Sequence, residues 1–222
     1  MTIHVRQAVE IIIKSLTTPK RVLEIGSRHE SNQKKIANLR SLFDNRSEYI
    51  GVDMRKGTGV DRVINGEKLP FKNNSFDLIL CLETLEHAEK PWVIAKEIER
   101  VLSKKGAMIV SSHQNMYIHK HPSDYFRFTP YGLSSLFKET KEKLVFSISV
   151  PFEDEVKLNP HAVMLLGWKT KTKARLKLKK ILKQNQGKIS VNKPYRHRLR
   201  DGLKILRRGL QEATFKQVIE FF

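Results

Sequence analysis

Residues 22–27 read VLEIGS, an apolar run that ends in an acidic residue, a glycine and a serine. The pattern predicts a buried strand followed by a tight turn into a helix. Glycine has no side chain, so a ligand can approach the backbone closely at Gly26. A dinucleotide-binding loop would continue as G-x-G-x-x-G, but Arg28 and Ser31 occupy the later glycine positions. Two interpretations stay open here: a ligand-binding loop that is not an NAD loop, and an ordinary strand-to-helix turn.

A second strand-end motif is YIGVD at residues 49–53. An acidic side chain at the end of a second strand can accept hydrogen bonds from both ribose hydroxyls of a nucleoside. In dinucleotide-binding folds that acid follows the glycine loop by about 20 residues, whereas Asp53 follows Gly26 by 27. A strand-end aspartate is also a common turn residue. Together with the first motif, the pattern favours a nucleoside ligand.

The first 169 residues alternate apolar runs with helix-like stretches, which indicates a parallel α/β fold. Strands are expected at 21–25, 48–52, 59–64, 76–81, 107–112, 144–150 and 162–168. Helices are expected at 2–16, 31–43, 92–102 and 130–138. We expect the third of these helices to stop near Gly106, and Thr129 to cap the fourth, with Pro130 in its first turn.

Composition narrows the class of protein. The chain has 222 residues, 40 % of them hydrophobic, which is enough for one α/β domain with a sizeable core. No run of about 18 apolar residues is present, so no integral membrane segment is expected. The apolar run in residues 2–16 is too short for a signal peptide core, and it predicts an amphipathic helix instead. The single cysteine, Cys81, excludes an intrachain disulfide and favours a reducing cytoplasm.

The positive charge is concentrated at the C-terminal end. Residues 166–222 hold 17 Lys and Arg against 3 Asp and Glu, a net charge of +14 out of +19 for the chain. We therefore divide the chain into a domain at 1–169 and a basic, helical extension at 170–222, in which Leu176, Ile181 and Leu182 share one side of a helix. The partners considered for the extension are an anionic membrane surface, placing the protein at the inner face of the membrane, and nucleic acid. Sparse aromatics make nucleic acid the weaker candidate, and a solubilising tail is the simplest explanation.

A third stretch carries the most specific signal. Residues 69–71 read LPF, residues 75–77 read SFD, an apolar run follows, and residues 85–87 read LEH. With EIGSR at 24–28 and the stretch from His119 to Pro130, these ordered motifs resemble the type-11 family of class I S-adenosylmethionine-dependent methyltransferases. The resemblance covers roughly residues 20–169. It implies a Rossmann-like, seven-stranded, mostly parallel sheet with helices on both faces.

The resemblance also implies S-adenosyl-L-methionine as cofactor and assigns residues to it. Those that match the family's cofactor-binding positions are Glu24, Gly26, Ser27, Arg28, Asp53, Met54, Asn65, Gly66 and Glu83. By this likeness Glu24 and Gly26 lie beside the methionine part, Asp53 binds the ribose hydroxyls and Met54 flanks the adenine. Many relatives have Asp at the position of Asn65, but an amide oxygen also accepts a hydrogen bond.

Residues for the acceptor are expected on the loops that follow the fourth and fifth strands. His119 and Tyr125 are candidates to orient or deprotonate an acceptor hydroxyl, and His87, Asp124 and Arg127 are candidates for substrate binding. Two structural alternatives stand beside these roles: His87 caps a helix, and Asp124 pairs with Arg127 to rigidify a lid.

The sequence indicates no metal site and no nucleophilic cysteine. Four histidines, at positions 113, 119, 121 and 161, lack the paired spacing of a zinc site. Cys81 lies in an apolar run and is expected in the core. The hypothesis at this point is methyl transfer from S-adenosylmethionine to an unidentified acceptor, either a small molecule or a cell-surface sugar. Its rivals are an RNA methyltransferase that uses the basic extension and a non-catalytic binding module with the same fold.

Overall fold

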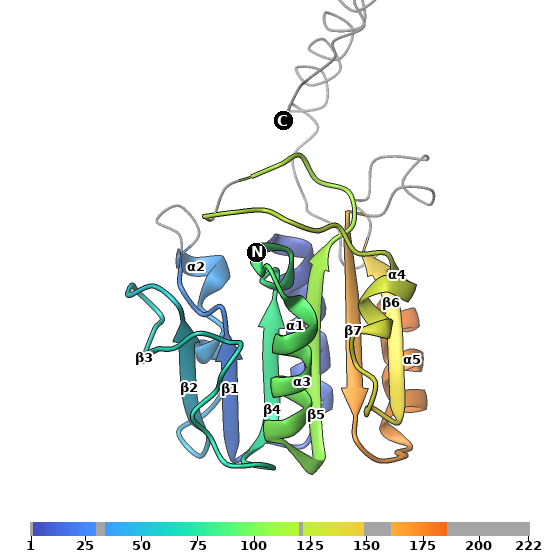
Figure 1. Ribbon diagram of the computed structural model, residues 1–222. Coiled ribbons are helices and arrows are strands. Elements are labelled where there is room, and N and C mark those ends of the chain that lie inside the picture. Colours follow the sequence, from blue (N-terminus) through green and yellow to red (C-terminus); the bar gives the residue numbers. More distant parts are fainter. Residues whose placement is uncertain (1, 30–33, 120–121, 149–160, 186–222) are drawn as a thin grey trace, which may run out of the picture. The chain divides into compact units, whose positions relative to one another are not determined.

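A computed structural model of the chain describes residues 2–29, 34–119, 122–148 and 161–185. Within these residues, seven strands form one sheet in the order β3-β2-β1-β4-β5-β7-β6. The strands are β1 (Arg21–Ile25), β2 (Glu48–Asp53), β3 (Arg62–Val63), β4 (Phe76–Leu82), β5 (Leu102–His113), β6 (Glu142–Ile148) and β7 (Ala162–Trp168). Neighbouring strands from β3 to β5 pair in parallel, and β7 runs antiparallel to both β5 and β6. The expected Rossmann-like, mostly parallel sheet is confirmed (Figure 1).

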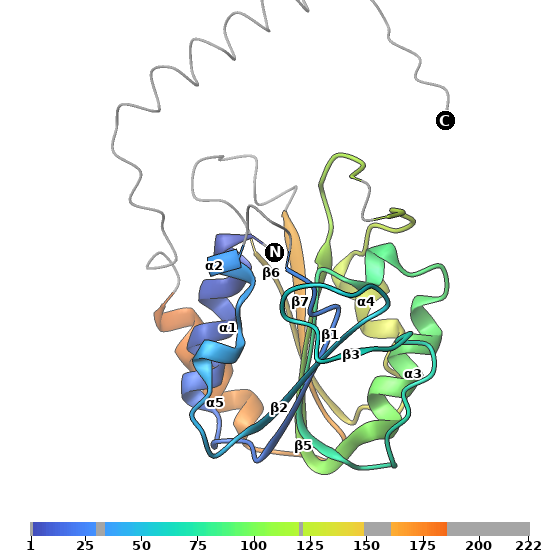
Figure 2. The ribbon, with the colours of Figure 1, turned by 90° about the vertical axis from the view of Figure 1, so that its left-hand side faces the viewer.

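Helices cover both faces of this sheet, so its central strands are apolar on both sides. One face carries α1 (Ile3–Ser15), α2 (Lys34–Ala37) and α5 (Ala174–Gln184), and the other carries α3 (Pro91–Val101) and α4 (Pro130–Ser135) (Figure 2). Each face has its own hydrophobic core. Cys81 is fully buried in one of them, as expected of a core residue.

The amphipathic helix expected at the N-terminal end is α1. The Thr2 side chain accepts a hydrogen bond from the Val5 N–H, which satisfies one donor of the first turn. Val5, Val9 and Ile12 are fully buried against the sheet. Among the described residues, no helix is both long and apolar enough to cross a membrane.

Several expected elements have different bounds. The helix expected at 31–43 is wrong beyond residue 37: α2 ends at Ala37, and a short 3₁₀ helix, η1, follows at Arg40–Leu42. The Arg6 guanidinium donates hydrogen bonds to the carbonyls of Ile36 and Asn38. A longer helix would use these carbonyls for its own backbone hydrogen bonds, so the Arg6 contacts favour an end of the helix here.

The third expected helix ends before Gly106, because β5 already starts at Leu102. Gly106 therefore lies within a strand, where a Cβ would come within 2.9 Å of the Asp77 carbonyl oxygen of β4. The strand expected at 59–64 is confined to Arg62 and Val63, an exposed edge strand that starts after the positive-φ turn at Gly59.

The basic helix expected after residue 169 belongs to the compact unit that covers residues 1–189. Leu178 of α5 is fully buried in the core that α1 shares. The apolar side differs from the expected one at Leu176, which is 63 % exposed, whereas Leu182 packs against this core as expected. The rest of the basic extension, residues 186–222, lies outside the described residues.

Candidate active site

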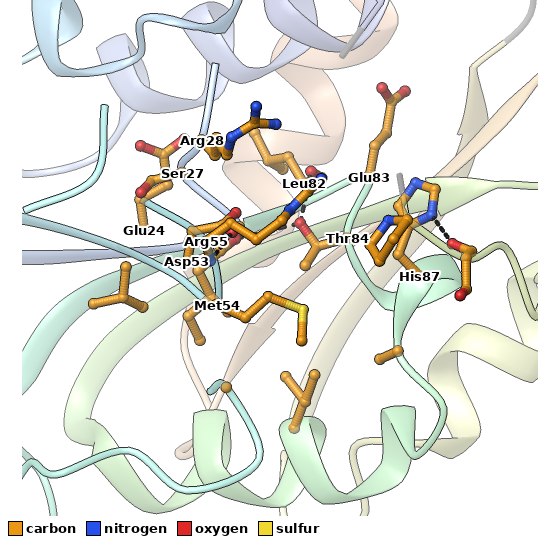
Figure 3. A pocket seen from close by; sticks show the side chains of 18 of the residues that line it. Glu24, Ser27, Arg28, Asp53, Met54, Arg55, Leu82, Glu83, Thr84 and His87 are labelled. Atoms are coloured by element: carbon orange, nitrogen blue, oxygen red, sulfur yellow. Dashed lines mark hydrogen bonds between the residues drawn. The ribbon is translucent and has the colours of Figure 1, made fainter. Parts of the chain in front are cut away.

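A cavity of about 820 Å³ opens where the carboxyl ends of β1, β2, β4 and β5 meet. This edge is where open α/β sheets bind ligands. All nine residues expected to bind the cofactor line the cavity, and so do His87, His119 and Tyr125. Asp124 and Arg127 are not among its lining residues. In Figure 3, Glu24 and Asp53 lie on one side of the cavity and Glu83 and His87 on the other, with Thr84 between them.

The turn after β1 requires a glycine. Gly26 has a φ of 77°, in the region that side chains avoid, and a Cβ there would lie 2.2 Å from the Thr84 Oγ1. The Gly26 and Ser27 N–H groups both donate to the Val52 carbonyl, which ties the turn to β2. The absence of a side chain at Gly26 lets the Thr84 side chain pack directly against this turn.

Glu24 is a buried carboxyl group inside this wall. Only 7 % of the residue is exposed, and its Oε2 accepts a hydrogen bond from the Tyr49 hydroxyl. Burial raises the pKa of Glu24 to about 7, with the Tyr49 hydrogen bond acting in the opposite direction. A carboxyl group with such a raised pKa can lose its proton when a cationic ligand group binds beside it.

The end of β2 supplies the second acid. Asp53 Oδ1 accepts a hydrogen bond from the Arg55 N–H, 2.9 Å away, which shapes the turn that carries Met54. Met54 is 60 % exposed and projects its thioether toward the open space (Figure 3). The Asn65 Oδ1 likewise accepts from the Glu67 N–H. Both polar residues thus have a turn-forming role as well as a place on the cavity wall.

Glu83 follows β4 directly and is held in a strained backbone conformation. Its φ is 48°, which is unusual for a residue with a side chain and is tolerated mainly at functional sites. Its N–H donates to the Ser111 carbonyl, and its Oε2 accepts from the Thr2 N–H at 3.1 Å. The side chain is only 5 % exposed, so α1, β4 and β5 meet at this carboxylate.

A cluster of histidine and glutamate side chains forms the wall next to Glu83. Glu86 lies in the 3₁₀ helix η2 (Leu85–His87), His113 ends β5, and His119 lies on the following loop. Glu86 Oε1 is 3.5 Å from His113 Nε2, and the rings of His113 and His119 have centroids 5.1 Å apart. His87 packs against His119 with a centroid distance of 4.9 Å, while its Nδ1 is bonded to the Ser123 carbonyl.

Burial controls the protonation of this cluster. It lowers the pKa of His113 to about 3, with the neighbouring His161 and His119 acting in the same direction, so the imidazole is neutral at ordinary pH. Burial raises the pKa of Glu86 to about 8, although the Ser112 hydroxyl donates to its Oε2.

Asp124 and Arg127 pair with each other behind this wall. The two guanidinium nitrogens lie 2.6 and 2.7 Å from the two Asp124 oxygens, and the guanidinium also donates to the carbonyls of Met116 and Tyr117. The guanidinium lowers the pKa of Asp124 well below its usual range. Asp124 in turn accepts from the His119 N–H and lies 3.1 Å from its Nδ1. The structure therefore agrees with the alternative in which Asp124 pairs with Arg127. The pair holds the loop that carries His119.

Several lining residues were not expected from the sequence. These are Thr2, Thr84 and His113. The signal available for His113 was its place at the end of a strand that ends at the same sheet edge as the two recognised motifs. Thr2 carries no such signal, because only the packing of α1 brings it there.

Part of the chain is similar to a known family. Residues 23–110 match the type-11 family model described as a methyltransferase domain. An uncharacterised protein of Methanocaldococcus jannaschii is 34 % identical over 129 residues, 55 % of each chain. The matched segments span 55 % and 34 % of the lengths of the two curated relatives.

Solved structures agree on the fold. A methyltransferase of Burkholderia thailandensis with bound 1,6-didemethyltoxoflavin and S-adenosylhomocysteine aligns with a TM-score of 0.54 at 16 % identity, covering 76 % of this chain and 79 % of the other. An S-adenosylmethionine-dependent methyltransferase of Archaeoglobus fulgidus aligns with a TM-score of 0.55 at 14 % identity, covering 73 % and 93 %. Residues 23–110 are thus similar to the type-11 methyltransferase domain, and the described sheet has the fold of S-adenosylmethionine-dependent methyltransferases.

Proposed function

We propose that the cavity binds S-adenosylmethionine across the ends of β1 and β2 and transfers its methyl group to a small-molecule or sugar acceptor held at the ends of β4 and β5. The observation that carries this proposal is the placement of Gly26, Glu24 and Asp53 on one side of a single cavity, opposite Glu83 and His87 (Figure 3).

In this proposal each wall has a separate task. Asp53 accepts hydrogen bonds from the ribose hydroxyls, and Met54 and Asn65 flank the adenine. Glu24, beside the Gly26 turn, meets the positively charged methionine end, where an ionised carboxylate is stabilised by the cofactor's ammonium group. The basic side chain of Arg28 lies in the same loop near Gly57 and completes the rim of the cavity.

The chemistry needs positioning more than a reactive side chain. A sulfonium methyl group is already activated, so alignment of the acceptor with the S–CH3 bond can supply about 7–11 kcal/mol of barrier lowering. If the acceptor is a hydroxyl, a nearby base removes its proton. His119 stands on the cavity wall with its ring oriented by Asp124, and the half-exposed Tyr125 lies close by at the mouth.

The first experiment is calorimetric titration of the full-length chain with S-adenosylmethionine and with S-adenosylhomocysteine in moderate salt. We expect both to bind with micromolar dissociation constants, and Asp53→Ala to weaken S-adenosylhomocysteine at least about tenfold by removing two hydrogen bonds to a charged group. Asp44→Ala is the matched control, because Asp44 is a surface carboxylate that pairs only locally with Arg46. No binding of either ligand to the wild-type protein would contradict the proposal.

A further inference from the structure

The histidine and glutamate cluster beside the cavity has the geometry of a metal site. Glu86, His113 and His119 come from three separate segments, yet each offers a ligand atom, and these atoms all lie within 4.8 Å of one another. The closest measured pair, Glu86 Oε1 and His113 Nε2, is 3.5 Å apart. A tetrahedral ion with bonds of about 2.1 Å places its ligand atoms about 3.4 Å apart, so this pair is spaced for one ion.

One buried member of the cluster, Glu86, has a polar atom that lacks a hydrogen-bond partner among the described residues. Glu86 is completely buried, and its Oε1 has no hydrogen-bond partner among the described residues, while the Ser112 hydroxyl holds the other oxygen. His113 is 3 % exposed, and its Nε2 faces that Oε1. Buried polar atoms are almost always hydrogen-bonded or bound to an ion or water. The open position on Glu86 is therefore directed at a ligand.

The third member, His119, has the carboxylate contact that metal-binding histidines usually have on their second ring nitrogen. A ligating histidine typically bonds its second ring nitrogen to a carboxylate, which fixes the orientation of the ring. His119 Nδ1 lies 3.1 Å from Asp124 Oδ2, and Asp124 is itself fixed by Arg127 through two short hydrogen bonds. This arrangement makes Nε2 the nitrogen that we assign to the ion.

We propose that Glu86, His113 and His119 bind one divalent transition-metal ion, of the kind represented by Zn²⁺ and Mn²⁺. Two imidazoles and one carboxylate suit such ions, whereas Mg²⁺ and Ca²⁺ prefer oxygen ligands alone. Glu83 is near enough to contribute as well, since its Oε2 lies 3.8 Å from His113 Nε2.

The site also suggests what the ion does, and this part rests on the proposed function. His113 and His119 line the cavity, so an ion held by them would lie within reach of an acceptor bound there. With the ion bound, both ring nitrogens of His119 would be engaged, so the ion would replace His119 as the group that promotes deprotonation: a hydroxyl bound to such an ion loses its proton to water more easily. Its oxygen then forms the O–CH3 bond while the S–CH3 bond breaks, and sulfur keeps the bonding pair in S-adenosylhomocysteine. The acceptor class that fits is an alcohol, such as a sugar hydroxyl, rather than an amine.

The test is metal binding itself. Full-length protein, stripped with EDTA and dialysed, is titrated calorimetrically with MnCl2, ZnCl2 and, for contrast, MgCl2. We expect one Mn²⁺ or Zn²⁺ per chain and much weaker Mg²⁺ binding. His119→Asn and Glu86→Gln should each weaken Mn²⁺ binding at least about tenfold, the scale seen when metal-site residues are altered. His29→Asn is the matched control, because His29 lines the cavity near Gly59, outside the cluster.

The outcomes separate this proposal from the previous one. Absence of saturable Mn²⁺ and Zn²⁺ binding to the wild type, or equal binding by the His119 and His29 variants, overturns the metal site. If Glu86→Gln fails to fold because its site is buried, His119→Asn decides alone, since its side chain is 14 % exposed. The same samples are titrated with S-adenosylhomocysteine: its binding without metal binding leaves the cofactor proposal standing, and the reverse result leaves only the metal site.

Discussion

The two sides of the cavity are built in different ways. The side at β1 and β2 is formed by short contiguous motifs, in which Gly26 follows β1 directly and Asp53 is the last residue of β2. The side at β4 and β5 is assembled from Glu83, Glu86 and His113, brought together by strand pairing and loops. A contiguous motif depends on local backbone geometry, whereas the assembled side depends on long-range contacts. The two sides should therefore respond to different kinds of substitution.

The largest effect is expected from Gly26→Ala on the contiguous side. The new Cβ would overlap the Thr84 Oγ1 at 2.2 Å, and φ of 77° adds about 1–2 kcal/mol of backbone strain. We expect loss of measurable S-adenosylhomocysteine binding by calorimetry and a clearly lower urea midpoint. In the double variant Gly26→Ala/Thr84→Ala, part of the stability should return, because the overlap is relieved while the strain remains. A Gly26→Ala protein with wild-type affinity would show that the turn is not the floor of the cofactor site.

This difference also explains what the sequence predicts. The strands at 21–25 and 162–168 were predicted to the residue, because strands that are buried on both faces of a sheet show as continuous apolar runs. All nine cofactor positions lie on the cavity wall because each belongs to a motif that ends a strand. The meeting of Glu86, His113 and His119 was not predictable in this way. It depends on the pairing of Leu82 with Ser111 and on the path of the loop after β5, which no local spacing records.

The same reasoning accounts for the errors in the helices. The helix expected at 31–43 has the right apolar spacing, but Arg6, some thirty residues earlier in the chain, takes its carbonyls. Leu178 is buried instead of Leu176 because the rotation of α5 is set by its contact with α1. Periodicity predicts that a helix has an apolar side, while its partner decides which residues form that side.

The second largest effect is expected at Glu24, which tests the contiguous side by pH. Its pKa is about 7 in the folded chain against 4.5 as the ordinary value, so the folded state keeps a proton that the unfolded state loses. Stability from this group is therefore present below pH 4.5 and falls as pH rises to 7, by about 3 kcal/mol in all. This loss of stability is measured by comparing the urea unfolding midpoints of the wild type and of Glu24→Gln between pH 4.5 and 8.

The comparison with Glu24→Gln is needed because other groups titrate in the same window. Glu86, with a pKa of about 8, also makes stability fall as pH rises, while His113, with a pKa of about 3, makes stability rise as pH increases from 3 to 6.5. These contributions are common to both proteins and cancel in the difference. A difference that does not change with pH would mean that Glu24 is ionised throughout and meets water.

The smallest effect on the whole protein, and the most selective, is expected from Arg127→Ala on the assembled side. Removing the guanidinium leaves the Asp124 carboxylate, whose side chain is 1 % exposed, without its main partner, at a cost of about 1–3 kcal/mol. The loop that orients His119 should loosen, so Mn²⁺ binding should weaken by about tenfold or more. S-adenosylhomocysteine affinity should stay within about twofold of the wild type, because Arg127 does not line the cavity.

Arg46→Ala, which breaks an exposed pair with Asp44, is the control and should leave both affinities unchanged. Equal losses of metal and cofactor affinity on Arg127→Ala would instead mean that the two sides form one cooperative unit, and that the division between contiguous and assembled sides does not extend to binding.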